Sequence, residues 1–89
     1  MDLLMSENGA DIVVYTTRWC PGCWRAKQVM KSMQVSHKEI DITKDENAVE
    51  TVMRLNSGYR SVPTIVFPDG SHLTEPHVNE LKVKLEALA

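Results

Sequence analysis

The sequence lacks long hydrophobic runs, basic clusters and all but two cysteines, and each shortage excludes a class of protein. No apolar stretch approaches the ~18 residues that a membrane-spanning helix needs. Ten Lys and Arg against twelve Asp and Glu leave a net charge of −2, which argues against a nucleic-acid partner. The first residues, Met1 to Glu7, carry acidic rather than basic side chains and do not resemble a signal peptide. We therefore expect a cytoplasmic protein that contacts neither membrane nor nucleic acid.

What the sequence does contain is ordinary for one globular domain. Its 89 residues are 43% hydrophobic and 25% charged, which is typical of a soluble fold with a modest core. The first ten residues end near the turn-prone pair Asn8-Gly9 and show no periodic pattern. We expect residues 1–10 to form a flexible extension and residues 11–89 to form the domain.

Both cysteines lie in one short segment, Arg18-Trp19-Cys20-Pro21-Gly22-Cys23. An apolar, β-branched run at residues 12–15 predicts a buried strand before it, and apolar residues at helical spacing predict a helix after it. Pro21 suits the first helical position, so Cys20 is expected at the N-cap. Free backbone N–H groups and the positive end of the helix dipole favour a thiolate there. Thiols in such positions titrate at about 3.5–7.5, below the ~8.5 of a free cysteine.

The spacing of the two cysteines favours redox chemistry over three alternatives. Side chains three residues apart on a helix are neighbours, so one thiol can attack and the other can resolve by forming a disulfide. A purely structural disulfide would constrain the unfolded chain little across two residues. A zinc site would need His72 and His77, but 48 residues separate Cys23 from His72, against about 12–15 in a compact finger. Two inert core thiols are the third alternative.

The remaining pattern predicts alternating strands and helices. A strand, helix and strand over residues 11–16, 21–34 and 36–42 form a βαβ unit, whose strands should be parallel. Thr43 and Glu46 fit a capping box for the next helix, and Asn56-Ser57-Gly58 fit its end. A hairpin then follows over residues 65–73 around Pro68-Asp69-Gly70, and Pro76 opens the last helix.

This order of elements resembles the glutaredoxin group of the thioredoxin superfamily over about residues 11–88. Two motifs carry the resemblance, Trp19-Cys20-Pro21-Gly22-Cys23 and Val62-Pro63-Thr64. It implies an α/β, thioredoxin-like fold with a four-stranded mixed sheet and three helices in the order β-α-β-α-β-β-α. It also implies a cis Val62-Pro63 bond beside Cys20, which leaves the Val62 backbone free to pair with an extended thiol.

The segment Leu73-Thr74-Glu75-Pro76-His77 departs from the usual glutaredoxin pattern. Glutaredoxins have a Gly-Gly-x-Asp-type sequence there, whose N–H groups hold a carboxylate of glutathione. Here Glu75 would repel that carboxylate, and Pro76 has no N–H to offer. By contrast, residues 69–76, together with residues 15–20 and 60–64, look like the mycoredoxins, actinobacterial glutaredoxin-like proteins that use mycothiol.

The resemblance therefore implies a thiol-disulfide oxidoreductase that reduces mixed disulfides between a small thiol and proteins. Cys20 and Cys23 would be catalytic, and the thiol would be held by Arg18, Trp19, Arg60, Val62, Pro63 and Thr74. We expect no metal and no bound cofactor, with mycothiol or glutathione as co-substrate. The expected partners of this monomer are oxidised or thiolated proteins, the small thiol and its reductase. Two alternatives remain open: a thioredoxin-reductase-driven electron donor to a protein such as ribonucleotide reductase, and an iron–sulfur cluster carrier.

Overall fold

The computed structural model describes residues 11–88, which alternate between strands and helices in the predicted order. The expected extension, residues 1–10, lies outside the described residues. The elements are β1 (Ile12–Thr16), α2 (Pro21–Ser32), β2 (His37–Asp41), the 3-10 turn η1 (Ile42–Lys44), α3 (Glu46–Leu55), β3 (Thr64–Val66), β4 (His72–Thr74) and α4 (Val78–Leu88). The predicted sequence of four strands and three α-helices is confirmed for this part of the chain.

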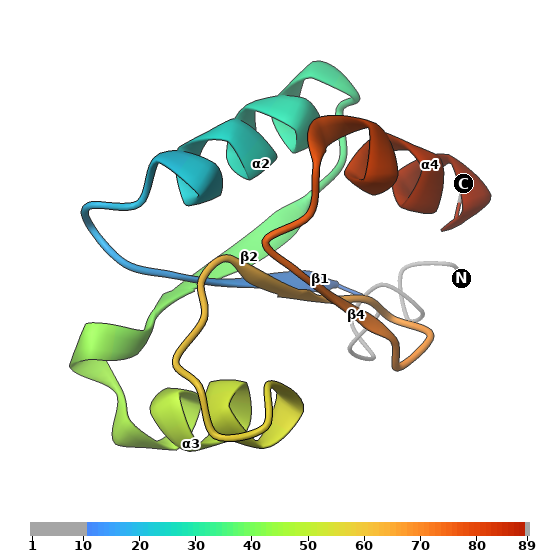
Figure 1. Ribbon diagram of the computed structural model, residues 1–89. Helices are drawn as coiled ribbons and strands as arrows, with labels where there is room; N and C mark the ends of the chain where they lie inside the picture. The colour runs from blue at the N-terminus through green and yellow to red at the C-terminus, as the bar shows by residue number, and fades with distance from the viewer. Residues whose placement is uncertain (1–10, 89) are drawn as a thin grey trace, which may run out of the picture.

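The four strands form one mixed sheet in the order β2-β1-β3-β4. Strands β1 and β2 are parallel, with Ile12 opposite His37, as a βαβ unit requires. The pairs β1–β3 and β3–β4 are antiparallel. Figure 1 shows α2 and α4 over one face of this sheet and α3 over the other. The sheet is therefore the central layer of three.

Alternation along β1 explains why both faces of the sheet are covered. Ile12 and Val14 are buried in the larger core cluster, which they share with residues of α2 and α4. Tyr15 points to the opposite layer, where it packs against the smaller cluster of Ile42, Ala48 and Val52. Because successive side chains of a strand point to opposite faces, one five-residue strand supplies both cores.

The start of α3 differs from the predicted capping box at Thr43. Asp45, not Thr43, is the N-cap, and its carboxylate accepts from the backbone N–H groups of Asn47 and Ala48 at 2.9 and 3.3 Å. Thr43 lies within η1 instead, where its N–H and hydroxyl donate to Asp41. Burial of Ile42 in the smaller core explains the shift, because the chain turns immediately after β2 to bring this side chain inward.

The last helix begins later than Pro76. Helix α4 starts at Val78, and its first backbone bond runs from the Leu81 N–H to the His77 carbonyl at 3.0 Å. Residues 75–77 carry the chain from β4 to the layer above, with Glu75 in a left-handed conformation at φ 48°. Leu81 and Leu85 of this helix are buried, whereas Val78 and Leu88 are each 37% exposed. None of the helices within residues 11–88 has the length and apolarity to cross a bilayer.

Candidate active site

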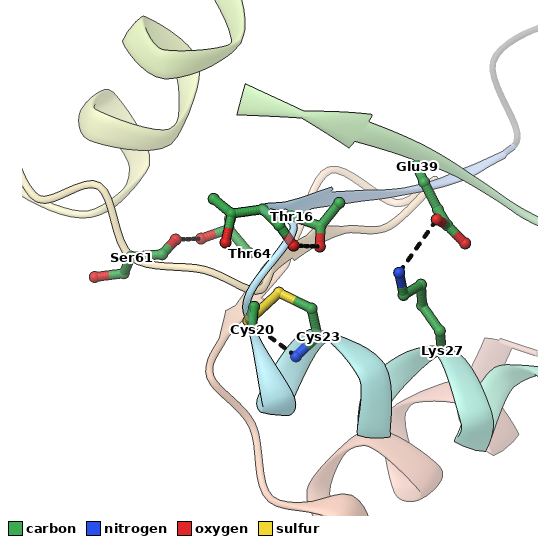
Figure 2. Close-up of a disulfide and its surroundings, with 8 residues drawn as sticks. Thr16, Cys20, Cys23, Lys27, Glu39, Ser61 and Thr64 are labelled. Atoms are coloured by element: carbon green, nitrogen blue, oxygen red, sulfur yellow. Dashed lines mark hydrogen bonds and ion pairs between the residues drawn. A yellow bond between two sulfur atoms is a disulfide. The ribbon is translucent and has the colours of Figure 1, made fainter. Parts of the chain in front are cut away.

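The two cysteines occupy the first turn of α2, at the positions that the sequence predicts. Cys20 is the N-cap with an extended backbone, and Pro21 is the first helical residue. The pair forms a disulfide with its Cα atoms 5.2 Å apart. The backbone N–H of Cys23 donates to the Cys20 sulfur at 3.0 Å, as Figure 2 shows. The N-cap therefore directs an N–H donor at the sulfur that would carry negative charge after reduction.

The two sulfurs differ sharply in access. Cys23 is only 1% exposed, whereas Cys20 is partly exposed at the rim of a cleft. Cys23 points into the protein because it lies on the same side of α2 as the buried Ala26 and Met30. Cys20 lies before the helix, where the chain has just left β1. An external disulfide can therefore reach Cys20 far more readily than Cys23.

The segment before β3 forms the wall opposite the cysteines. The Val62-Pro63 bond is cis, as the resemblance implies, and Pro63 is buried. Gly22 lies directly beside this proline, since a Cβ added at Gly22 would lie 3.3 Å from Pro63 Cδ. The Pro63 carbonyl accepts from the Glu75 N–H at 2.8 Å. This bond joins the Pro63 segment to the loop between β4 and α4.

These three segments enclose a cleft of about 600 Å³ at one end of the molecule. Most of its lining comes from the start of α2, the Val62-Pro63 segment and the start of α4. The lining residues are Thr17, Trp19, Cys20, Pro21, Gly22, Arg25, Ala26, Val62, Pro63, Glu75, Pro76, His77, Val78 and Leu81. The cleft is large enough for a small thiol compound, since ligand pockets are typically ~300–1,000 Å³.

Only part of the predicted thiol-binding set lines this cleft. Trp19, Val62 and Pro63 do, and Trp19 is 88% exposed beside Cys20. The other three predicted residues, Arg18, Arg60 and Thr74, are not among the lining residues. The Thr74 hydroxyl donates to the Asn56 side chain instead.

Arg18 is exposed, and its positive charge reaches a carboxyl group at the end of β2. Hydrogen bonds from the Thr43 hydroxyl and N–H lower the pKa of Asp41, and the positive charge of Arg18 contributes further to this lowering. The charge of Arg18 therefore lowers the pKa of a carboxyl group at the β2 edge of the sheet, which is the edge opposite β4.

Three charged or titratable side chains line the cleft without having been predicted as ligands. Arg25, Glu75 and His77 border it from α2 and from the loop before α4. Arg25 could have been found from spacing, because it lies one helical turn after Pro21 and Gly22 and so shares their face. His77 gave no such signal, because its position depends on where α4 begins.

The carboxyl groups with clearly lowered pKa values lie outside the cleft. Burial raises the pKa of Glu39, but hydrogen bonds to His37 and Lys27 outweigh this effect and lower it overall. Figure 2 shows the Lys27 contact, which joins α2 to β2 at 3.3 Å. Hydrogen bonds from Lys84 and Ser71 lower the pKa of Asp69 at the β3–β4 turn. All three carboxylates accept hydrogen bonds from residues outside the cleft.

The alternative of a zinc site finds no ligand set in the part of the chain that the structure describes. No group of three or more His, Cys, Asp or Glu side chains there is arranged to hold a metal ion. Cys20 and Cys23 are instead paired with each other.

Comparison with known proteins agrees with this geometry. The family model described as glutaredoxin matches residues 12–73. The chain is 41% identical over 80 residues to a glutaredoxin-like protein of Mycobacterium tuberculosis, covering 90% of this chain and 95% of the relative. It is 38% identical over 81 residues to mycoredoxin 1 of Corynebacterium glutamicum, covering 90% and 99%. Among solved structures, a thioredoxin-like protein of 32% identity superimposes with a TM-score of 0.71, covering 89% of this chain and all of the other.

The match spans both motifs of the cleft, from β1 to β4. The fold is thioredoxin-like, with the four-stranded mixed sheet and three helices that the resemblance implies. The chain belongs to the glutaredoxin family and is a thiol-disulfide oxidoreductase with a redox-active dithiol.

Proposed function

We propose that this protein reduces mixed disulfides between a low-molecular-weight thiol, mycothiol or a close analogue, and cytoplasmic proteins. The observation that carries the proposal is the unequal access of the two sulfurs at the cleft. Cys20 borders a space that fits a small thiol, and Cys23 lies behind it at 1% exposure. A reducing compartment suits this dithiol, because a cytoplasmic CxxC pair is usually catalytic rather than structural.

The reaction begins when the Cys20 thiolate attacks the small thiol's sulfur in the mixed disulfide. The S–S bond to the target protein breaks, and the target leaves as a thiolate that takes up a proton. Cys20 then carries the small thiol in a new disulfide. A second small thiol can attack this adduct, releasing the symmetrical small-molecule disulfide and restoring Cys20.

Cys23 offers a second way to resolve the adduct. Its thiolate can attack Cys20, expelling the small thiol and leaving the Cys20–Cys23 disulfide, in which the protein has lost two electrons. The 5.2 Å separation of the Cα atoms suits this closure. A partner reductase or two small thiols must then return those electrons. The same closure supports a second candidate function, direct electron donation to the disulfide of a target protein.

The choice of thiol depends on the charge at the end of the cleft. Pro76 has no N–H to donate, but α4 begins only at Val78, so the N–H donors of its first turn are intact. Glu75 remains as a carboxylate lining the cleft. Two like charges about 4 Å apart in water repel by ~1 kcal/mol, equivalent to about fivefold in rate. Glutathione would bring its carboxylate to this end of the cleft, next to Glu75. Mycothiol has uncharged sugars in place of that carboxylate and would escape this repulsion.

The test compares two substrates on the Cys23→Ser variant, which isolates attack by Cys20. Mixed disulfides of one test peptide with mycothiol and with glutathione are reacted in single turnovers. We expect the mycothiol compound to react about fivefold faster or more. Glu75→Gln in the same background is the matched control, because it removes the charge and keeps the shape. It should narrow the preference by accelerating the glutathione reaction.

Equal rates for the two compounds would contradict the proposed thiol specificity. If the mycothiol compound reacts faster but Glu75→Gln leaves the ratio of the two rates unchanged, mycothiol is still the preferred thiol and Glu75 is not the cause of the preference. A variant that reacts with neither compound, while wild type reduces a protein disulfide, would favour the second candidate function.

A further inference from the structure

One asparagine side chain outside the cleft connects three elements through hydrogen bonds. Asn56 follows α3 as its C-cap, and its Nδ2 donates to the Val52 carbonyl at 2.8 Å and to the Thr64 hydroxyl at 2.9 Å. Its Oδ1 accepts from the Thr74 hydroxyl. Both N–H donors and one lone pair of the amide oxygen are therefore used, by α3, β3 and β4.

The partners allow only one orientation of this amide. The Val52 carbonyl can only accept, so it must face the NH₂ group. The Thr64 hydroxyl donates its proton to the Ser61 carbonyl at 2.7 Å, so it too can only accept from Asn56. The Thr74 hydroxyl is then left to donate to the amide oxygen. Donors and acceptors match at every contact, and Thr64 is fully buried.

The network leads directly to both walls of the cleft. The hydrogen bond from Thr64 to Ser61, visible in Figure 2, closes the chain around Val62 and Pro63, which lie between them. On the other side, Thr74 is the last residue of β4 and is followed by the cleft residue Glu75. Two segments that line the cleft, Val62-Pro63 and the loop that begins at Glu75, form two of its walls. The Asn56 amide thus anchors the residue after the first wall, Thr64, and the residue before the second wall, Thr74.

We propose that Asn56 is a positioning residue that, together with the hydrogen bond from the Glu75 N–H to the Pro63 carbonyl, sets the spacing between these two walls and thereby the docking of the thiol substrate. The proposal rests on the proposed function in so far as a small thiol occupies the cleft. Asn56 does not line the cleft and takes no part in bond making or breaking. Its effect reaches the substrate through the Val62 backbone and the Glu75 loop.

The chemistry of the network predicts which substitutions are tolerated. Asn56→Ala removes all three contacts. Asn56→Asp keeps the shape but places carboxylate oxygens against the Val52 carbonyl and against a Thr64 hydroxyl whose proton is already committed to Ser61. Both variants should let the walls shift. Thr64→Ser keeps the hydroxyl and should be tolerated, whereas Thr64→Val removes it and should resemble Asn56→Ala.

The test uses two reactions of Cys20 in the Cys23→Ser background. One is attack on the mycothiol–peptide mixed disulfide, which needs both walls. The other is alkylation by iodoacetamide, which needs only the thiolate. We expect Asn56→Ala and Asn56→Asp to slow the first reaction by on the order of ten- to a hundredfold and to change the second by less than about twofold. Leu85→Ala, which opens the larger core outside the cleft, is the destabilised control and should slow neither reaction at temperatures where it is folded.

Three results would overturn the proposal: an unchanged rate with the mixed disulfide in both Asn56 variants, an equal loss in alkylation, or the same loss in Leu85→Ala. If an Asn56 variant does not fold, the comparison of Thr64→Val with Thr64→Ser decides in its place. If the Cys23→Ser protein shows no preference for mycothiol over glutathione, only the assignment of mycothiol as the thiol fails. The Asn56 comparison is then read on the glutathione compound or on a protein disulfide.

Discussion

The unequal reactivity of the two cysteines is the most direct prediction of this structure. Cys20 is the N-cap of α2, and its sulfur accepts the Cys23 N–H at 3.0 Å. In the reduced protein the same donor and the helix dipole stabilise a thiolate at Cys20. Cys23 lies inside the first turn at 1% exposure, where burial disfavours the charged form. We expect Cys20 to be alkylated much faster than Cys23 at pH 6.

The magnitude follows from ionisation and intrinsic nucleophilicity. A thiol with a pKa of about 6.5, within the range for helix N-termini, is ~24% ionised at pH 6, against ~0.3% for an ordinary thiol near 8.5. This ratio is about 80. The more acidic thiolate is intrinsically the weaker nucleophile, by roughly eightfold for a Brønsted coefficient near 0.45. The net advantage is about tenfold before access is considered, and burial of Cys23 can only increase it.

The assay alkylates the fully reduced protein with iodoacetamide at pH 6 and counts modification at each cysteine by peptide mass spectrometry. Cys20→Ser and Cys23→Ser, measured separately, provide the control, because each reports one thiol without competition. Cys20→Ser should also abolish disulfide reduction, whereas Cys23→Ser should keep activity on small-thiol mixed disulfides and lose activity on protein disulfides. Equal alkylation rates for Cys20 and Cys23 would refute the assignment of Cys20 as the attacking thiol.

Two further predictions concern the acid stability of the scaffold and the packing beside the cysteines. Hydrogen bonds from Lys84 and Ser71 lower the pKa of Asp69 below its usual 3.8, so its stabilising contribution is present above that pH and is lost as the pH falls further. Urea unfolding should therefore show Asp69→Asn to be less stable than wild type at pH 7, with a gap that narrows below pH 3.8; a constant gap would contradict the linkage. Gly22→Ala would place a Cβ 3.3 Å from Pro63 Cδ, and Pro63 is buried and held through its carbonyl, so we expect severalfold slower attack on the mixed disulfide without loss of stability. An unchanged rate would show that Pro63 can move away at little cost.

The parts of the site that lie within one local segment could be predicted from the sequence. Cys20 at the N-cap and Pro21 at the first helical position follow from backbone preferences that act within a single turn. The same is true of the parallel β1–β2 pair, because a βαβ crossover leaves little choice of geometry. The cis Val62-Pro63 bond required the family resemblance, since a proline before a strand has a more ordinary explanation.

Predictions that depended on an element boundary were less successful. Thr43 and Glu46 have the residue types and the spacing of a capping box. Asp45 nevertheless caps α3, because burial of Ile42 places Thr43 within η1. Pro76 fits the first position of a helix, yet the chain needs residues 75–77 to cross from β4 to the next layer. In both regions a long-range packing demand moved the boundary by two residues, and local patterns carry no information about such a demand.

Thr74 shows that a segment can be recognised from the sequence while the contacts of its side chains are not. The sequence placed it near the thiol because the surrounding segment resembles a ligand-binding stretch. In the fold its hydroxyl donates to Asn56, eighteen residues earlier in the chain, and the cleft is lined instead by the next residue, Glu75. An asparagine after a helix predicts a helix end and nothing more, so Asn56 gave no sign that it would meet both β3 and β4. Its importance arises only where three elements from different parts of the chain meet. For that reason the attacking sulfur could be identified from the sequence, whereas the group that we infer to fix the spacing of the cleft walls required the fold.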